Sequence, residues 1–221
     1  PAVPFPQGAA RPGERLVLVR VDQALRVPGE PGVHLDRPRH AAVHAEDRAV
    51  DGGDIYTMIE NEGITFACMA PAVLATILEY PDKDEHTITT VPRFLIAGAP
   101  PPQAFVKRLE EELGWTFMQI YGLTETSPIL TVSEMKTHLG LEGDAYYRMK
   151  ARAGHDVIGT DVRVFGAGGE EVEWDDESVG EIAARSNVVL RGYWQQQEET
   201  DKVIRDGWFY TGDMATVNKH G

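Results

Sequence analysis

Short apolar runs that alternate with helical segments constrain the fold of this chain most strongly. The runs are continuous, whereas a strand with one solvated face alternates apolar and polar residues. They occur at residues 64–69, 94–97 and 117–120, and the helical segments occur at 55–63, 71–79 and 103–113. Helices that alternate with buried strands are typical of an α/β fold. We therefore predict a parallel sheet with flanking helices that cover both of its faces.

The pattern changes beyond about residue 155. Apolar and polar residues alternate at 161–165 and at 180–185, and three glycines between 166 and 169 mark a turn between strands. This spacing predicts a small antiparallel β region. A helix near 197–204 precedes a further strand at 207–210. We therefore divide the chain into an atypical segment at 1–50, a partial α/β subdomain at 51–155 and a β subdomain at 156–221.

The segment at 1–50 differs in composition from the rest of the chain. It holds seven of the 14 prolines and contains no Lys, Ser or Thr. One interpretation is a Pro-rich, partly disordered linker. The alternative is a GC-rich gene read out of frame, with the true frame resuming between residues 51 and 56. Both interpretations stay open.

The overall composition excludes several classes of function. The net charge of −14, from 35 acidic and 21 basic residues, argues against nucleic acid as the main partner. No apolar run approaches the length of a membrane span, and no signal peptide is visible, so we expect a cytoplasmic protein. Cys68 is the single cysteine, which excludes an internal disulfide. Because Cys68 lies in an apolar run, we expect a buried, inert thiol in preference to a nucleophile.

Three short motifs carry the candidate chemistry. Gly98, Ala99 and Pro100 follow an apolar run, Tyr-Gly-Leu-Thr-Glu at 121–125 follows another, and Thr-Gly-Asp at 211–213 follows an aromatic strand. Each motif has a plain structural alternative. The first and third could be turns, whereas Thr124 could cap a helix that has Glu125 in its first turn. Ligands bind at the carboxyl ends of strands in open α/β sheets, so a nucleotide and a hard cation are the functional interpretation.

Together and in this order, the motifs resemble those of the acyl-adenylate-forming, or AMP-binding, enzyme superfamily. The resemblance rests on Tyr-Gly-Leu-Thr-Glu-Thr-Ser-Pro at 121–128, on Gly-Glu-Ile at 180–182 leading to Arg-Gly-Tyr-Trp at 191–194, and on Glu-Thr at 199–200 followed by residues 206–213. It extends from about residue 54 to residue 221. The sequence at 121–128 looks most like that of the fatty acyl-CoA synthetases.

The resemblance implies a reaction and a set of residue roles. Such enzymes join a fatty acid or another carboxylate to ATP, with Mg²⁺, and then transfer the acyl group from AMP to coenzyme A. By resemblance, Thr124 contacts the α-phosphate and Glu125 coordinates Mg²⁺, and these two are the catalytic candidates. The expected nucleotide-binding residues are Gly98, Ala99 and Pro100 against adenine, Tyr121 stacked on it, Gly122, Thr124, and Asp213 on the ribose hydroxyls. Gly122 is also expected to face the acyl substrate.

The sequence also departs from the family pattern. No Ser/Thr/Gly-rich phosphate loop is recognisable in residues 1–50, and the sequence stops at 221, before the positions of the ribose-binding arginine and the mobile C-terminal domain. We therefore expect a fragment that is inactive alone. A non-functional remnant, an AMP-binding module without catalysis and another carboxylate-adenylating enzyme stay open as alternatives. So does a homodimer of the full-length enzyme.

Overall fold

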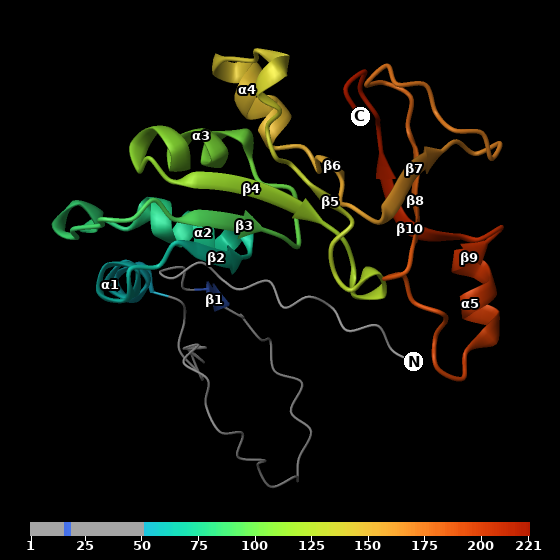
Figure 1. Ribbon diagram of the computed structural model, residues 1–221, viewed down its shortest axis with the longest axis horizontal. Helices are drawn as coiled ribbons and strands as arrows, with labels where there is room; N and C mark the ends of the chain where they lie inside the picture. Colours follow the sequence, from blue (N-terminus) through green and yellow to red (C-terminus); the bar gives the residue numbers. More distant parts are fainter. Residues whose placement is uncertain (1–15, 19–50) are drawn as a thin grey trace, which may run out of the picture. The chain divides into compact units, whose positions relative to one another are not determined.

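The computed structural model describes the backbone of residues 16–18 and all of residues 51–221 (Figure 1). Its described residues form two compact units. The first unit runs up to Ile96 and includes Lys107–Phe117, and the second comprises Ala97–Val106 and Met118–Gly221. Apart from the strand at 16–18, both interpretations of the 1–50 segment concern residues outside those described.

The predicted helices and strands occur in the expected order, and further short elements lie between them. The α-helices of the described residues are α1 (Gly52–Glu62), α2 (Pro71–Glu79), α3 (Gln103–Glu112), α4 (Gly143–Lys150) and α5 (Gln197–Val203). The strands are β1 (Leu16–Leu18), β2 (Phe66–Met69), β3 (Arg93–Ile96), β4 (Thr116–Tyr121), β5 (Thr131–Val132), β6 (His155–Asp156), β7 (Thr160–Phe165), β8 (Gly180–Ser186), β9 (Ile204–Arg205) and β10 (Trp208–Ala215). The α/β class with a separate antiparallel sheet is thereby confirmed.

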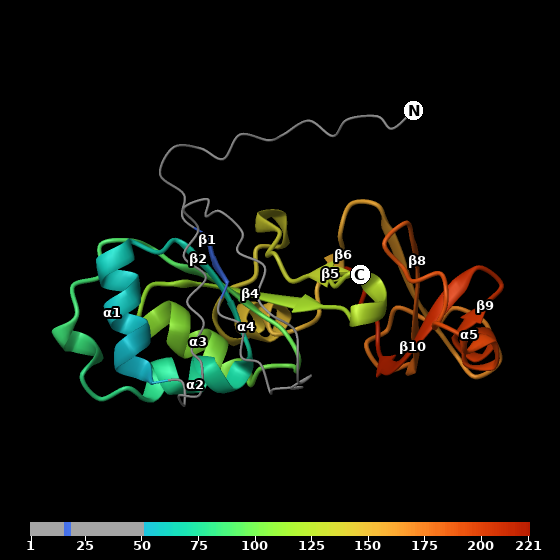
Figure 2. The same ribbon diagram turned by 90° about the horizontal axis from the view of Figure 1, so that it is seen from below.

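The first unit is built on parallel strands. β1 pairs with β2 and β2 pairs with β3, both in parallel, with Cys68 aligned to Leu95. α1 and α2 pack against each other and so lie on the same side of these strands (Figure 2). The sequence predicted helices on both faces. Because right-handed connections that step along a sheet in one direction place their helices on one face, the observed arrangement follows from the strand order.

Local capping sets where α1 begins and ends. The Asp51 carboxylate accepts hydrogen bonds from the N–H groups of Gly53 and Asp54, at 2.8 and 3.3 Å, so the helix starts earlier than its apolar pattern indicates. Gly63 ends it in the left-handed conformation, with φ +59°. The core beside this helix is apolar, with Leu74, Ile77 and Phe94 fully buried.

Cys68 is half-buried rather than fully buried, because side chains along β2 alternate between a buried and a partly exposed face. Burial raises the pKa of its thiol. A thiol with a raised pKa is less often in its nucleophilic thiolate form. The inert thiol stays a prediction that the raised pKa supports, whereas the expectation of a buried side chain was wrong.

The second unit contains an antiparallel extension of the sheet. β4, whose residues belong to both units, pairs with β5, and β5 pairs with β6, both antiparallel. The complete strand order is β1-β2-β3-β4-β5-β6. β5 and β6 are two residues long each, which is too short for a periodic signal in the sequence.

A separate antiparallel sheet completes the second unit, in the order β7-β8-β10-β9. Val164, Val172 and Ile182 form its apolar cluster, and Tyr121 packs against them. The pairing of β10 with β8 shifts register between Tyr210 and Met214, so residues 211–213 form a bulge within the strand. No helix among the described residues is long and apolar enough to cross a membrane.

Candidate functional site

Tyr121 and Asp213 meet at the centre of the candidate site. Tyr121 is the last residue of β4, and Asp213 lies in the bulge of β10. The Tyr121 hydroxyl donates a hydrogen bond of 2.7 Å to Oδ2 of Asp213, across 92 positions of sequence. Burial raises the pKa of this hydroxyl, and Asp213 adds to the effect, so the hydroxyl stays protonated and donates. The pair joins an aromatic ring to an exposed carboxylate within one unit.

The bulge that carries Asp213 is fixed by three hydrogen bonds. The Thr211 hydroxyl donates to the Ile182 carbonyl at 3.0 Å and accepts from the Asp213 N–H at 3.2 Å. The Gly212 N–H donates to Oε1 of Glu181 at 3.0 Å. Gly212 has φ +81°, a region that favours glycine. The alternative of a plain turn at 211–213 is therefore wrong, because these residues lie within a strand and point a carboxylate outward.

Gly122 is required by a close backbone approach. A Cβ atom added at this position would lie 1.9 Å from the carbonyl oxygen of Pro128, so no other residue fits without moving the loop. The Leu130 N–H donates to the Tyr121 carbonyl at 2.8 Å, which closes the same loop. The motif at 121–128 is thus a tight return of the chain that presents the side chains at 124 and 125.

Thr124 and Glu125 lie in a 3₁₀ turn at Thr124–Thr126. The N-cap position is Leu123, so the alternative role of Thr124 as a helix cap is wrong. The buried Thr126 hydroxyl satisfies the start of the turn instead, because it accepts from the Leu123 N–H at 2.9 Å. The Thr124 side chain is exposed and free to meet a ligand. Glu125 does lie in the first turn, as the structural alternative proposed.

Glu125 is hydrogen-bonded to the segment at 190–194, which includes the Arg-Gly-Tyr-Trp motif. Its Oε1 accepts a hydrogen bond of 3.1 Å from the Tyr193 hydroxyl, and its backbone carbonyl accepts one of 2.7 Å from the Leu190 N–H. Burial raises the pKa of the Tyr193 hydroxyl, and the Glu125 charge raises it further. The second carboxylate oxygen, Oε2, has no hydrogen-bond partner among the described residues.

The donor set at Glu125 fits a cation that is shared with a ligand. No group of three or more His, Cys, Asp or Glu side chains that could hold a metal occurs within residues 51–221. Mg²⁺ is commonly held by one or two carboxylates together with substrate phosphates and water, so a single Glu is sufficient on the protein side. Glu125 therefore fits Mg²⁺ bound with a nucleotide and does not fit a metal held by the protein alone.

The segment that follows β3 is exposed at Gly98, Ala99 and Pro100. Gly98 has φ +93°, which explains a glycine at the first of these positions. The Gln119 amide Nε2 donates to the Ile120 carbonyl at 3.2 Å and approaches the Ala99 carbonyl at 3.5 Å. Gln119 thus connects the end of β4 to this segment.

Sequence reasoning missed Gln119. Its side chain is 5% exposed, and its Oε1 is a buried acceptor without a partner in the described structure. Turning the amide round would set Oε1 against two carbonyl oxygens, so the observed orientation is the favourable one. A glutamine inside the otherwise apolar run at 117–120 was the signal that could have identified it, because buried amides need partners.

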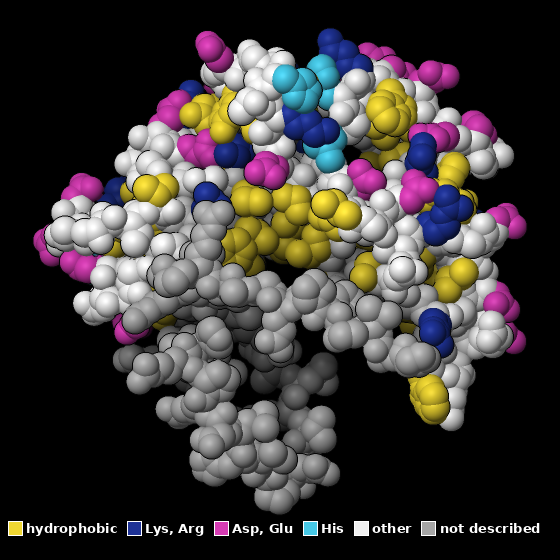
Figure 3. All heavy atoms as spheres, viewed as in Figure 1, with side chains coloured by type: hydrophobic (Ala, Val, Ile, Leu, Met, Phe, Trp, Pro, Cys, Tyr) yellow, Lys and Arg dark blue, Asp and Glu magenta, His cyan; other side chains and the backbone are white. Residues whose placement is uncertain are grey.

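Pro100 and Tyr121 both line a cavity of about 570 Å³ in the second unit. Its other walls include Val162, Val164, Ile182, Ala215, Lys136, Arg152, His155 and His220. Gly98, Ala99, Gly122, Thr124, Glu125 and Asp213 do not line it. Figure 3 shows histidine side chains next to Lys and Arg side chains on one face of the molecule. The structure therefore groups Pro100 with Tyr121, and Tyr121 with Asp213.

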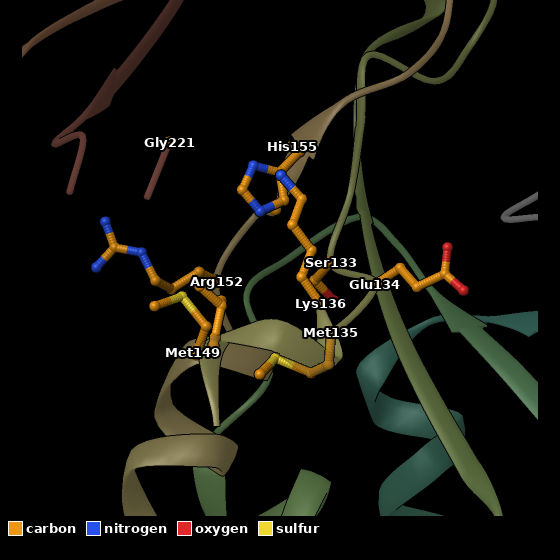
Figure 4. A pocket seen from close by; sticks show the side chains of 10 residues that line it. Ser133, Glu134, Met135, Lys136, Met149, Arg152, His155 and Gly221 are labelled. Atoms are coloured by element: carbon orange, nitrogen blue, oxygen red, sulfur yellow. The ribbon is translucent and has the colours of Figure 1, made fainter. Parts of the chain in front are cut away.

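A smaller pocket adjoins this cavity through Lys136, Arg152 and His155 (Figure 4). In Figure 4 the Lys136 side chain extends towards the His155 ring, whereas Arg152 points away from it. Nη1 of Arg152 donates to Asp176 at 2.6 Å, which neutralises its charge. Burial lowers the pKa of His155, and the Lys136 charge lowers it further. No pattern in the sequence indicated this basic wall.

Comparison with known proteins identifies relatives. The model of a family described as AMP-binding enzyme matches residues 40–194, more than half of the chain. A 4-hydroxybutyrate–CoA ligase of Metallosphaera sedula is 34% identical over 186 residues, which are 81% of this chain and 33% of that protein. A long-chain-fatty-acid–CoA ligase of Thermus thermophilus is 29% identical over 174 residues, which are 78% of this chain and 32% of that protein.

The fold is also found among solved structures. The inhibitor-bound N-terminal domain of FACL13 from Mycobacterium tuberculosis matches with a TM-score of 0.65 at 27% sequence identity. The match covers 77% of this chain and 40% of that domain. The chain spans about a third of the length of the curated relatives it matches, at 33% and 32%.

Proposed function

Because this chain belongs to the AMP-binding enzyme family, we propose that it forms part of an ATP-dependent acyl-CoA ligase. The substrate oxygen of a carboxylic acid attacks the α-phosphorus of ATP, which gives an acyl-adenylate and pyrophosphate. The thiol of coenzyme A then attacks the acyl carbonyl and releases AMP. The named ligases among its relatives support this reaction class. We propose a fatty acid as the substrate, because the sequence of the motif at 121–128 resembles that of fatty acyl-CoA synthetases.

The hydrogen bond between Tyr121 and Asp213 is the observation that carries this proposal. The carboxylate of Asp213 has about four acceptor positions, so it can keep the Tyr121 hydroxyl and still accept both hydroxyls of a ribose. Tyr121 is the neighbouring aromatic ring, on which a purine would stack. An aromatic ring and a diol acceptor at this spacing suit an adenosine.

The segment at 98–100 is the proposed second face of the adenine site. Gly98 and Ala99 contribute backbone without bulky side chains, and Pro100 lines the same cavity as Tyr121. We add Gln119 as a residue that would position this segment, because its buried amide approaches the Ala99 carbonyl at 3.5 Å.

Thr124, Glu125 and Gly122 are the proposed contacts of the reacting groups. The exposed Thr124 hydroxyl is a hydrogen-bond donor for the α-phosphate, and Glu125 would hold Mg²⁺ together with phosphate oxygens. When bound, Mg²⁺ would act as a Lewis acid that stabilises charge on the phosphates. Gly122 would let the acyl group approach the backbone closely, since it carries no side chain. Rate acceleration would then come from positioning and charge stabilisation.

Binding of AMP tests the nucleotide part of the proposal. We expect the 221-residue chain to bind AMP with a Kd of about 1 mM, near −4 kcal/mol. Asp213→Ala removes the ribose acceptor and should weaken binding at least about tenfold, because hydrogen bonds to a charged group contribute about 1.5–3 kcal/mol. Titration calorimetry measures both proteins.

The matched control is Asp82→Ala, which removes an exposed carboxylate in the first unit. It should leave the affinity for AMP unchanged. An equal loss in both variants, or no heat from the unsubstituted chain at millimolar AMP, would overturn the assignment. A cytoplasmic location and a homodimer of the whole enzyme stay predictions.

A further inference from the structure

We propose that Tyr193 is a positioning residue that holds the Glu125 carboxylate ready for a divalent cation. This inference rests on the function proposed above, and it adds a residue and a structural segment to that site. Its basis is the contact between two motifs that are 68 positions apart in sequence, at 121–125 and at 191–194.

Two hydrogen bonds join these motifs. The Tyr193 hydroxyl donates to Oε1 of Glu125 at 3.1 Å, which restrains the end of the side chain. The Leu190 N–H donates to the Glu125 carbonyl at 2.7 Å, which restrains its backbone. A partly exposed glutamate side chain without such contacts samples several rotamers, and this freedom is lost when a ligand orders it. The same loop thus fixes Glu125 at both ends.

The loop that carries Tyr193 is itself fixed by Thr200 of α5. The Tyr193 N–H donates to Oγ1 of Thr200 at 2.9 Å, and this hydroxyl donates to the Gln196 carbonyl, also at 2.9 Å. Thr200 is 7% exposed, which is unusual for a threonine on a surface helix. A Cβ atom at Gly192, which has φ +155°, would lie 2.9 Å from Cγ2 of Thr200. The loop therefore packs closely on α5, and this gives the Glu-Thr motif at 199–200 a structural role.

The chemistry of a tyrosine suits this task. Its hydroxyl donates one hydrogen bond and adds no charge, so the full negative charge of Glu125 stays available to a cation. A lysine or arginine here would neutralise the carboxylate. Oε1 is occupied by Tyr193, whereas Oε2 has no partner among the described residues, which leaves one oxygen open in a restrained direction. Restraint of this kind increases affinity by reducing the ordering cost of binding.

Paramagnetic broadening by Mn²⁺ tests the inference on the 221-residue chain. Mn²⁺ is titrated alone and with ATP, and the loss of amide signals is followed by ¹⁵N-resolved NMR. We expect broadening at residues 124–126, and none at these residues in Glu125→Gln. Tyr193→Phe should require about three to ten times more Mn²⁺ for equal broadening, as expected for the loss of one hydrogen bond. Mn²⁺ should also broaden signals around the acidic surface residues at 173–177. This broadening is the internal reference and should be the same in all variants.

Two pairs of variants separate positioning from loss of structure. Tyr210→Phe is the matched control, because the Tyr210 hydroxyl makes no hydrogen bond among the described residues. It should behave as the unsubstituted chain. Thr200→Val removes the hydroxyl that anchors Tyr193 and should resemble Tyr193→Phe, whereas Thr200→Ser keeps the hydroxyl and should restore the broadening. Thermal unfolding of each variant is measured in parallel.

Each outcome decides between the two proposals. Full broadening at 124–126 in Tyr193→Phe would overturn the positioning role and leave the metal role of Glu125 intact. Unchanged broadening in Glu125→Gln, or none in the unsubstituted chain with or without ATP, would overturn the metal role and the positioning role together. If Tyr193→Phe weakened AMP binding by the same factor as it weakened Mn²⁺ binding, Tyr193 would have only a structural role. The AMP measurement with Asp213→Ala is independent of all three results.

Discussion

The strands and helices of the first unit and the site segments of the second unit are held by different forces. Leu74, Ile77 and Phe94 are fully buried, and their stability comes from apolar area removed from water and from close packing. Tyr121 and Asp213 are half-buried and exposed, respectively, and hydrogen bonds and close backbone contacts hold them in place. Stability and ligand binding should therefore depend on separate sets of residues.

Backbone conformation shows the same contrast. α2 is a regular helix that begins at Pro71, a residue suited to the first helical turn. The site segments contain several positive-φ residues, among them Gly98 at +93°, Ser127 at +53° and Gly212 at +81°. Glycine adopts this region at little steric cost, whereas Ser127 keeps it only because surrounding contacts fix it. The stability of the first unit should therefore respond most to changes in side-chain volume. The geometry of the site segments should respond most to substitutions that disturb the backbone.

The largest effect on stability is expected from Leu74→Ala. This side chain is 0% exposed, and truncation of a buried leucine costs about 2–5 kcal/mol through lost burial and the cavity left behind. Urea unfolding measures the loss. Because Leu74 lies in the first unit and the nucleotide residues lie in the second, AMP affinity of the folded variant should be unchanged.

Leu141→Ala is the control for this substitution, since Leu141 is only half-buried. It should cost clearly less stability than Leu74→Ala. A Leu74→Ala protein that stays folded but loses AMP binding would contradict the separation between the two regions.

Gly122→Ala should have a smaller effect on stability and a larger one on binding. Its Cβ atom would meet the Pro128 carbonyl oxygen at 1.9 Å, so the loop at 121–128 must move. Overpacking of this kind costs about 1–3 kcal/mol. The displacement would also move Tyr121 and Glu125, so AMP affinity should fall, as measured by calorimetry.

The matched glycine is Gly168, where an added Cβ would meet only the flexible end of the Glu170 side chain. Gly168→Ala should change stability and AMP affinity little. If it impaired AMP binding as much as Gly122→Ala did, the close approach at Pro128 would not explain the glycine at 122.

Periodicity and capping signals predicted most of the first unit. The helix at 71–79 has the predicted bounds, because a proline opens it and a continuous apolar face follows. Helix α4 was missed, because Gly-Asp-Ala-Tyr-Tyr-Arg-Met-Lys has no extended apolar stripe and its apolar residues are mixed with charges. The two-residue strands β5 and β6 were missed because their pairing is set by tertiary contacts.

The candidate site was only partly predictable for a related physical reason. The residues at 121–125 and 213 were identified from their chemistry and their resemblance to a family, and their assigned roles stay predictions. The contact between Glu125 and Tyr193 could not be predicted, because hydrogen bonds between distant segments leave no periodic trace in a sequence. Gln119 did leave a trace, as an amide within an apolar strand.

The smallest expected effect concerns pH and the wall of the cavity near Tyr121. Burial lowers the pKa of His155, with added contributions from the charges of Lys136 and His220, whereas Asp156 acts in the opposite direction. In the unfolded chain a histidine has a pKa of about 6.5, so the unfolded state binds this proton at a higher pH than the folded state does. Above about pH 6.5 the histidine is largely neutral in both states and does not affect the pH dependence of stability. Below that value the unfolded state binds the proton more readily, so folding stability decreases as the pH falls.

His155→Gln removes this titrating group, so the variant should lose less stability than the unsubstituted chain between about pH 7 and pH 5 in urea unfolding. His138→Gln, at an exposed position in a 3₁₀ turn, is the control, and an equal gain in acid resistance there would contradict the role of partial burial at His155.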